Sequence, residues 1–309
     1  MFKILSRHLF IGIVVFLSFC GLTVRHGQAA ISADERAALI ALYNSTDGDN
    51  WTNNSGWKEP PLDADGFAMP GMENTWFGVT TGSGNTTVTQ INLRNNQLTG
   101  SIPPEIGNLS NLQALSLHRN QVSGDIPAEL GNLANLQAII LEFNELTGTI
   151  PTELGNLASL INLDLQNNQL TGNIPAELGN LISLEALDLR QNQLTGNIPI
   201  AIGSLPNLTG LILGQNKLTG AIPAELGGLL SLVYLFLNDN ELRGRIPAEL
   251  MNLTSLQNNS SDICGNHLFT NNEALRGFLN SKQIGGDWES CQSPPFSFYN
   301  PGVLLLLSD

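Results

Sequence analysis

The sequence predicts an α/β solenoid, because seven blocks of 24 residues repeat one pattern without a break from Val88 to Ser255. Each block has aliphatic residues at positions 1, 4, 6 and 11, an asparagine at position 9, and Gly-x-Ile-Pro after it. A fixed period of this length indicates structural units that stack on one another and bury a continuous core between them.

The first half of each block predicts a short β-strand. Positions 4 and 6 alternate with positions 3, 5 and 7, so one set of side chains points inward and the other outward. The strands of successive blocks are expected to lie parallel to each other, about 4.8 Å apart. Because the inward set is aliphatic in every block, the core lies on that side of the sheet.

The asparagine at position 9 marks the point where the chain turns out of the strand. A carboxamide has both donors and an acceptor, so it can pair with backbone groups of the turn in its own and neighbouring coils. We therefore predict a structural ladder made of Asn96, Asn120, Asn144, Asn168, Asn192, Asn216 and Asn240.

The second half of each block follows Leu-Thr-Gly-x-Ile-Pro-x-Glu-Leu-Gly-Asn-Leu, most completely at Leu170–Leu181. With the strand half, this pattern resembles the plant-type leucine-rich repeats of receptor-kinase ectodomains and polygalacturonase-inhibiting proteins. The departures are Arg243 in place of Thr or Ser and Ala201 in place of Glu. The resemblance implies a curved right-handed superhelix with a parallel β-sheet on its concave face. It also implies a second short strand after the turn, and 3₁₀ or coil structure on the convex side.

Residues 1–30 predict a secretory signal peptide, because Lys3 and Arg7 precede an apolar run from Leu9 to Val24 and small residues suited to cleavage follow. A membrane anchor and a lipoprotein attached at Cys20 also stay open. The apolar run is shorter than the roughly 20 residues that a spanning helix needs. The signal predicts a secreted or cell-surface protein, extracellular or periplasmic, with no stable membrane insertion after cleavage.

The charge of the chain excludes two classes of partner. The signal carries three of the 13 basic residues and none of the 27 acidic ones, so its removal changes the net charge from −14 to −17. A surface of this sign repels nucleic acid and anionic lipid. Acidic residues at one convex position of six blocks are interpreted as a solvated face.

Residues 31–87 predict a cap over the first coil, since a stack of repeats needs its apolar end covered. Ser32 and Glu35 have the spacing of a capping box at the start of a helix, and several tryptophans supply bulk. The segment from Ala38 to Trp57 resembles the cap of bacterial and lower-eukaryotic secreted repeat proteins. The cysteines that flank the plant cap are missing, so the resemblance implies a bacterial secreted protein.

Residues 256–293 predict a degenerate eighth repeat followed by a C-terminal cap. Thr270 and Glu273 have the spacing of a second capping box, which would begin another amphipathic helix.

Two cysteines bracket this helix. Because Cys20 leaves with the signal, Cys264 and Cys291 form an even pair in an exported protein, and we predict a disulfide between them. A metal site that uses His267 would need further ligands. The Pro-rich tail, residues 294–309, has no role that the sequence identifies.

Function is expected on the outward positions of the strands, because the fold does not require particular residues there. Apolar and aromatic residues on a solvent-facing sheet, with arginines beside them, are typical of binding sites. The candidate partner-binding residues are Arg94, His118, Arg119, Ile140, Glu142, Phe143, Asp164, Asp188, Arg190, Ile212, Tyr234 and Phe236.

These residues predict a non-enzymatic recognition protein, expected to be a monomer, that binds a protein or peptide ligand through its concave face. Aromatic and carboxylate neighbours leave a glycan ligand open. A passive surface or spacer module and an ectodomain fragment of a receptor stay open as well. No motif for a nucleophile, a phosphate loop or an EF-hand occurs, so no catalytic residue, cofactor or metal is predicted.

Overall fold

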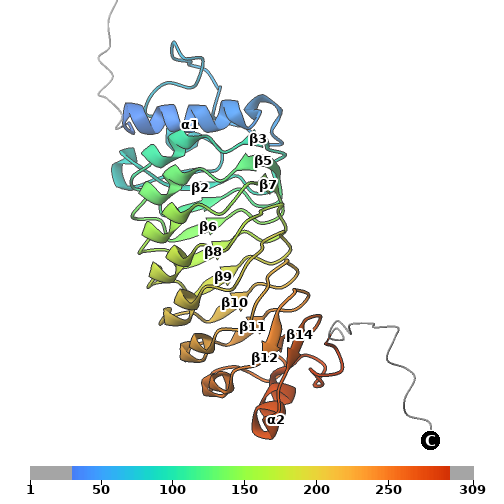
Figure 1. The fold of residues 1–309 in the computed structure, drawn as a ribbon. Helices are drawn as coiled ribbons and strands as arrows, with labels where there is room; N and C mark the ends of the chain where they lie inside the picture. Colours follow the sequence, from blue (N-terminus) through green and yellow to red (C-terminus); the bar gives the residue numbers. More distant parts are fainter. Residues whose placement is uncertain (1–29, 293–309) are drawn as a thin grey trace, which may run out of the picture.

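The computed structural model describes residues 30–292 and consists of stacked coils with a helix at each end (Figure 1). Strands from successive coils form a nine-stranded sheet that is parallel except at its first edge. The predicted α/β solenoid is therefore confirmed. In sheet order the strands are β1 (Val79–Thr81), β2 (Val88–Asn92), β4 (Ala114–Ser116), β6 (Ala138–Ile140), β8 (Asn162–Asp164), β9 (Ala186–Asp188), β10 (Gly210–Ile212), β11 (Tyr234–Phe236) and β13 (Ser261–Asp262).

The register of this sheet follows the repeat. Each residue pairs with the residue 24 positions further on, as Leu163 does with Leu187. The sequence spacing between paired residues is longer in the eighth coil, where Leu235 pairs with Ser261. At the other edge β1 pairs antiparallel with β2, so a hairpin covers the first coil.

A second set of short strands forms the side of the solenoid away from the concave sheet, as the resemblance implied. These are β3 (Thr99–Ser101), β5 (Gln121–Asp125) and β7 (Glu145–Thr147) in one sheet, and β12 (Arg243–Arg245) with β14 (His267–Phe269) in another.

The convex side consists of seven short 3₁₀ helices, each preceded by the proline of Gly-x-Ile-Pro. Proline fits at a helix start because no hydrogen bond within the helix is lost there. The segments are η4 (Pro104–Asn108), η5 (Ala128–Asn132), η6 (Thr152–Asn156), η7 (Ala176–Asn180), η8 (Ile200–Ser204), η9 (Ala224–Gly228) and η10 (Ala248–Asn252).

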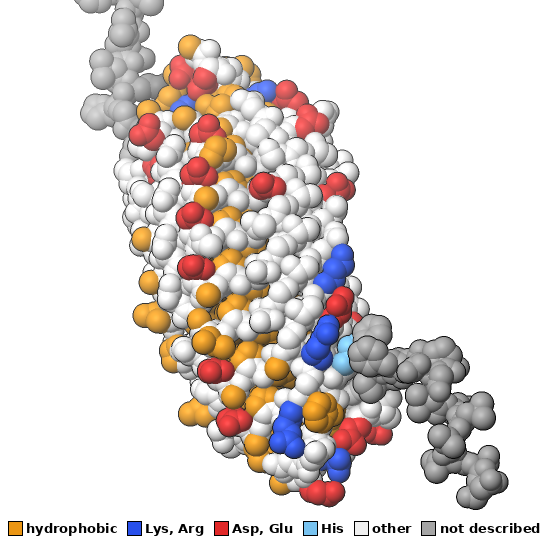
Figure 2. All heavy atoms as spheres, in the orientation of Figure 1, with side chains coloured by type: hydrophobic (Ala, Val, Ile, Leu, Met, Phe, Trp, Pro, Cys, Tyr) orange, Lys and Arg blue, Asp and Glu red, His pale blue; other side chains and the backbone are white. Residues whose placement is uncertain are grey.

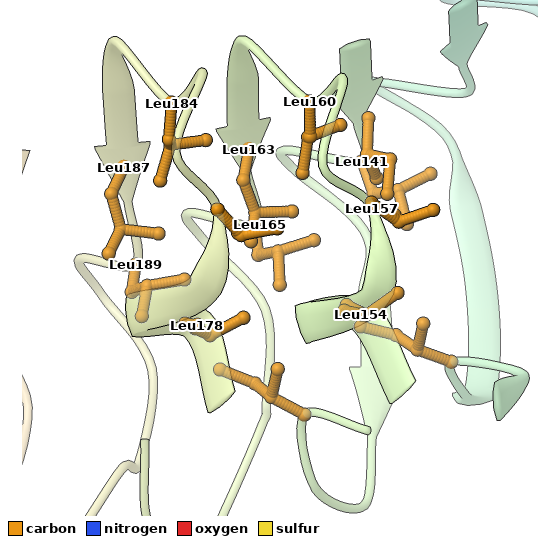
Figure 3. Close-up of a cluster of buried hydrophobic side chains, with 14 of the residues drawn as sticks. Leu141, Leu154, Leu157, Leu160, Leu163, Leu165, Leu178, Leu184, Leu187 and Leu189 are labelled. Carbon is orange, nitrogen blue, oxygen red and sulfur yellow. The ribbon is translucent and has the colours of Figure 1, made fainter. Parts of the chain in front are cut away.

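The core is a column of leucines enclosed between the concave sheet and the 3₁₀ helices. In the fourth coil Leu160, Leu163 and Leu165 point inward from the strand side and meet Leu154 and Leu178 from the 3₁₀ segments (Figure 3). All five are fully buried. Each coil fills its interior in the same way, which is why the predicted positions recur at a constant period.

Asn168 shows how one rung of the asparagine ladder connects two coils. Its Oδ1 accepts a hydrogen bond from the backbone N–H of Leu146 in the preceding coil at 3.0 Å. Its Nδ2 donates to the carbonyl oxygens of Leu141 in the preceding coil, at 3.0 Å, and of Leu165 in its own coil, at 3.1 Å. One side chain thus satisfies buried backbone groups of both coils.

The ladder is longer than predicted. Asn266 adds a rung in the eighth coil, where it accepts from Leu242 N–H and donates to Leu237 O. Gln292 ends the ladder by accepting from the N–H of Leu268. At the other end the Nδ2 of Asn96 donates to the backbone O of Asn53 in the cap, and its Oδ1 accepts from the Asn53 N–H. Asn120 differs from the other rungs in being only half-buried.

The N-terminal cap consists of the helix α1 (Ala33–Ser45), three short 3₁₀ turns at Gly48–Asn50, Glu73–Thr75 and Ser83–Asn85, and a cluster of aromatic rings. The predicted capping box is confirmed, since Ser32 and Glu35 accept each other's backbone N–H. Glu35 also accepts from the N–H of Val88 at 3.0 Å, which ties the start of α1 to the first repeat strand.

The C-terminal cap contains the helix α2 (Glu273–Lys282), but its predicted start was wrong. Asn272, rather than Thr270, is the N-cap residue, and its side chain accepts from the N–H of Leu275. Thr270 lies two residues before this N-cap, and its Oγ1 accepts from the backbone N–H of Asn272.

The predicted pairing of Cys264 with Cys291 is present, with a Cα–Cα distance of 5.1 Å. In the described part of the chain, no helix is long and apolar enough to cross a bilayer. The predicted signal and tail lie outside the described residues, except for Ala30.

We expect Asn168→Ala to lower the free energy of unfolding by about 1–3 kcal/mol, because it leaves buried backbone groups of two coils unpaired. Asn180→Ala is the matched control, since Asn180 is an exposed amide on the convex side; it should change the stability by less than about 0.5 kcal/mol. Urea denaturation measures both. Equal losses in the two variants would contradict the role of the ladder.

Candidate functional site

The outward positions of the strands come together on the concave face. The register aligns position 5 of successive coils into one row across the sheet. From the first coil to the eighth this row contains Asn92, Ser116, Ile140, Asp164, Asp188, Ile212, Phe236 and Asp262. The row is polar in the first two coils, apolar at Ile140, acidic in the fourth and fifth coils, apolar in the sixth and seventh, and acidic again at Asp262. With the neighbouring outward positions, the face divides into three chemically different zones.

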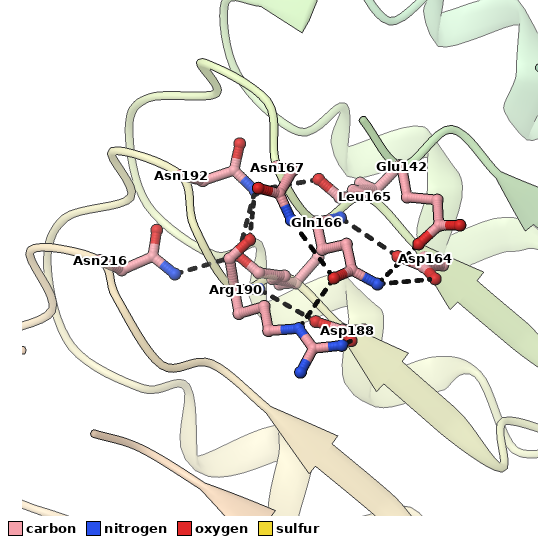
Figure 4. A network of polar contacts seen from close by, with 10 residues as sticks. Glu142, Asp164, Leu165, Gln166, Asn167, Asp188, Arg190, Asn192 and Asn216 are labelled. Carbon is pink, nitrogen blue, oxygen red and sulfur yellow. Dashed lines mark hydrogen bonds and ion pairs between the residues drawn. The ribbon is translucent and has the colours of Figure 1, made fainter. Parts of the chain in front are cut away.

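The central zone is a network of carboxylates around Gln166 (Figure 4). The Nε2 of Gln166 donates to Glu142 Oε2 at 2.8 Å and to Asp164 Oδ2 at 3.3 Å. Its Oε1 accepts from Arg190 Nε at 2.9 Å. Arg190 also forms an ion pair with Asp188 at 3.1 Å. The network thus contains three carboxylates and one guanidinium, which contacts Asp188 and Gln166, so it keeps a negative charge.

Burial affects the two aspartates of this network. Asp164 and Asp188 lie in register on neighbouring strands, and burial raises the pKa of both carboxyl groups. For Asp188 the pKa rises to about 6, because burial and the charges of Asp164 and Glu142 outweigh the attraction of Arg190. An additional cation at this position would therefore be stabilised.

The zone in the second and third coils carries positive charge and an exposed aromatic ring. Arg119 lies 4.6 Å above the centre of the Phe143 ring, a cation–π contact. Both residues have a positive φ, as position 8 does in every coil. Asparagine suits such a conformation and bulky residues do not. Position 8 is Asn, Gln or Asp in the other five repeats, so an arginine and an aromatic ring at this position are exceptions.

His118 belongs to the same zone. Its Nδ1 is 2.8 Å from the Ser116 Oγ, which orients the ring. Burial lowers the pKa of His118, and Arg94 and Arg119 lower it further, against the attraction of Glu142. The ring is thus neutral near pH 7.

The third zone, in the sixth and seventh coils, is apolar and hollowed. Ile212 is the outward side chain of β10, because glycines stand at positions 3 and 7 of this coil. Beside it Tyr234 is 47% exposed. The concavity next to Ile212 has a volume of about 240 Å³, and its lining consists of Arg190, Ile212, Gly214, Gln215, Phe236, Asn238 and Asp262.

The structure also corrects the predicted site in two respects. Asp188 was expected to face solvent, but it is 7% exposed, partly because it lies against Arg190. Gln166 and Asp262 were not predicted. Gln166 sits at an outward position that the repeat already identified, whereas the lengthened eighth coil concealed the place of Asp262.

Two family models match the repeats. Residues 90–196 match the model described as leucine-rich repeat region, and residues 182–242 match the one described as leucine rich repeat. Among curated proteins, none matches the chain.

Solved plant structures resemble the chain. The leucine-rich-repeat ectodomain of the Arabidopsis thaliana receptor kinase GASSHO1/SCHENGEN3, in complex with CASPARIAN STRIP INTEGRITY FACTOR 2, is 32% identical with a TM-score of 0.53. The match covers 81% of this chain and 34% of that one. The Arabidopsis receptor kinase HAESA, in complex with the peptide hormone IDA and the co-receptor SERK1, is 26% identical with a TM-score of 0.54. That match covers 77% of this chain and 46% of HAESA.

A plant ice-binding protein is 25% identical with a TM-score of 0.57, and the match covers 84% of this chain and 95% of that one. This chain spans about a third of the length of the first receptor ectodomains that it matches. Its repeats match leucine-rich-repeat models over residues 90–242 and are similar to those of plant receptor ectodomains.

The raised pKa of Asp188 predicts the direction in which pH changes stability. The folded state keeps the proton of Asp188 up to about pH 6, whereas the unfolded chain loses it near pH 4. The ionised carboxylate therefore opposes folding increasingly as the pH rises from about 4 to 6. Asp188→Asn removes that charge, so its melting temperature relative to the parent protein should be higher at pH 7.5 than at pH 4.0.

Glu177→Gln is the control, because Glu177 is an exposed carboxylate on the convex side. Calorimetry at both pH values should show little change of its relative melting temperature. The difference in melting temperature between Asp188→Asn and the parent protein would be the same at both pH values only if Asp188 had the same pKa in the folded protein and in the unfolded chain. That result would contradict the raised pKa of Asp188.

Proposed function

We propose that this chain is a secreted or cell-surface, non-enzymatic recognition protein that binds a protein or peptide through the concave face of its sheet. The observation that carries the proposal is the set of residues at positions that the fold leaves free. Aromatic and charged side chains occupy them, including Phe143 and Tyr234, which are 39% and 47% exposed. Partly exposed aromatic residues beside arginine are typical anchors of protein interfaces.

The dimensions of the face agree with this proposal. The strands of seven repeats span roughly 34 Å at the usual strand spacing, which suffices for an interface of about 800 Å² per partner. The similar receptor ectodomains support a peptide as the class of ligand, because HAESA was solved with a peptide hormone. They also support an extracellular location, as does the predicted signal.

A second candidate function, ice binding, is favoured by a different surface. Beside the row of acidic side chains on the 3₁₀ helices lies a broad area that is mostly uncharged (Figure 2). In the fourth and fifth coils this area, the lateral face, consists of exposed hydroxyl and amide side chains. They are Gln169, Thr171, Asn173, Gln193, Thr195 and Asn197.

The backbone holds the lateral face in a regular array, through the bridges between Thr149 and Thr171 and between Asn173 and Thr195. Identical polar groups repeated about 4.8 Å apart can hold water in a regular arrangement. The similarity to a plant ice-binding protein supports this candidate.

The recognition function predicts that the aromatic residues of β11 contribute to binding and not to folding. Changing both Tyr234 and Phe236 to Ser should leave the melting temperature within a few degrees. The same change should weaken binding of a partner isolated from the native medium by about 2 kcal/mol or more, roughly thirtyfold. Glu177→Ser, on the convex side, should leave the affinity unchanged.

Titration calorimetry with the isolated partner provides the measurement. Full affinity without both aromatic residues would exclude this end of the face from the interface. A neutral oligosaccharide as the isolated partner would favour a glycan-binding function.

The ice-binding candidate predicts that the protein inhibits the recrystallisation of ice. Changing both Thr171 and Thr195 to Lys should abolish this inhibition, because long charged side chains disrupt the array. The Tyr234 and Phe236 double variant should retain it. If the unmodified protein has no effect on ice crystals, the candidate is rejected.

A further inference from the structure

The sixth coil is unusual because two outward positions lack a side chain. Gly210 and Gly214 flank Ile212 on the concave face. A Cβ added at Gly210 would meet no atom within 4 Å, and its φ is not in the left-handed region. Neither packing nor backbone conformation therefore requires glycine at this position. The other glycine, Gly214, lines the concavity of about 240 Å³ beside Ile212, where the missing side chain leaves space above the sheet.

The floor of this space is apolar and its borders are charged. Ile212 and the ring of Phe236 line the 240 Å³ concavity, a size that suits one large side chain. In the row of position 5, Asp188 precedes Ile212 and Asp262 follows Phe236. Arg190 is the cation in the lining.

The carboxylates around the concavity are not balanced by the cations that contact them. Arg190 is already engaged by Asp188 and by Gln166. Asp262 accepts hydrogen bonds from Gln283 Nε2 at 2.7 Å and from the Cys264 N–H at 3.0 Å, and both donors are neutral. Together with Asp164 and Glu142, this part of the face has four carboxylates and one guanidinium. An apolar ligand is therefore favoured if it brings a positive charge.

We propose that the concave face binds an extended peptide segment in which a large apolar side chain enters the concavity between Ile212, Gly214 and Phe236 and a basic residue lies over Asp164 and Asp188. This inference rests on the proposed recognition function and specifies the partner. The basic residue lies over β8 and β9 and the apolar residue over β10 and β11, a separation of about two strand spacings, or about 10 Å. An extended chain covers this distance in about three residues. The partner sequence therefore has Lys or Arg two to four positions away from Phe, Tyr, Leu, Ile or Met.

The test is selection of random dodecapeptides on the whole secreted protein, followed by measurement of the affinity of the most enriched peptide by fluorescence polarisation. We expect the basic and apolar residues at the stated spacing. Ile212→Ser should remove part of the apolar floor of the concavity without disturbing the fold, because Ile212 points outward, and should weaken binding of this peptide at least tenfold. The matched control is Ile182→Ser, because Ile182 lies outside the strands of the concave sheet and is 60% exposed; it should leave the affinity unchanged.

The charge requirement has its own test. Changing both Asp164 and Asp188 to Asn should weaken the selected peptide about tenfold and reduce the dependence of its affinity on salt. Replacing the basic residue of the peptide by Gln should weaken its binding to the unmodified protein by the same factor. The same replacement should change its affinity for the double variant little.

The outcomes separate this inference from the proposed function. If selected peptides lack a basic residue, or if the Ile212→Ser variant binds as tightly as the parent protein, the inference is wrong. In that case a loss of binding in the Tyr234 and Phe236 double variant would still support the recognition function. If no peptide is enriched, or if neither variant weakens the enriched one, the peptide-binding function and the inference both fail.

Discussion

The structure depends on the hydrogen bonds that one buried amide makes to two coils. Each strand on the concave sheet is short, and the chain then turns through a region whose backbone groups face the interior. The rung at Asn168 pairs such groups of its own coil and of the preceding one. Because an unpaired buried N–H or C=O opposes folding by about 1–3 kcal/mol, the coils must stay in phase. The constant 24-residue period follows from this requirement, and it also stacks the leucines of successive coils into one buried column.

A stack of this kind needs special solutions at its two ends, where a coil has only one neighbour. At the first coil the N–H of Val88 has no preceding repeat strand to pair with, and Glu35 from α1 accepts its hydrogen bond. At the last coil Gln292 takes the place of a further asparagine. The disulfide at the adjacent Cys291 joins this residue to the eighth coil. The caps therefore continue the hydrogen bonding of the repeats and also cover their apolar ends.

The same regularity leaves the outward positions free to vary. The inward side chains and the asparagine ladder stabilise each coil, so the concave face can carry cations, carboxylates and apolar residues in successive zones. Position 8 is an example, because every coil holds it at a positive φ, and Phe143 is accommodated there although the conformation suits asparagine. Strain at a surface position within a well-stabilised coil is tolerated, and residues of this kind cluster at sites of function.

The sequence by itself determined the solenoid, the parallel sheet, the ladder from Asn96 to Asn240 and the first capping box, because each depends on residue spacing within one coil or at one helix start. Only the tertiary structure decided what depends on neighbouring coils. The rung at Asn266 was missed because the eighth coil is lengthened, and the exposure of Asp188 was overestimated because its contact with Arg190 could not be read from alternation. The concavity beside Ile212 and Gly214 likewise exists only between the side chains of adjacent strands. Spacing along one chain fixes which side of a sheet a residue faces, whereas burial, pairing and open space depend on the residues stacked beside it.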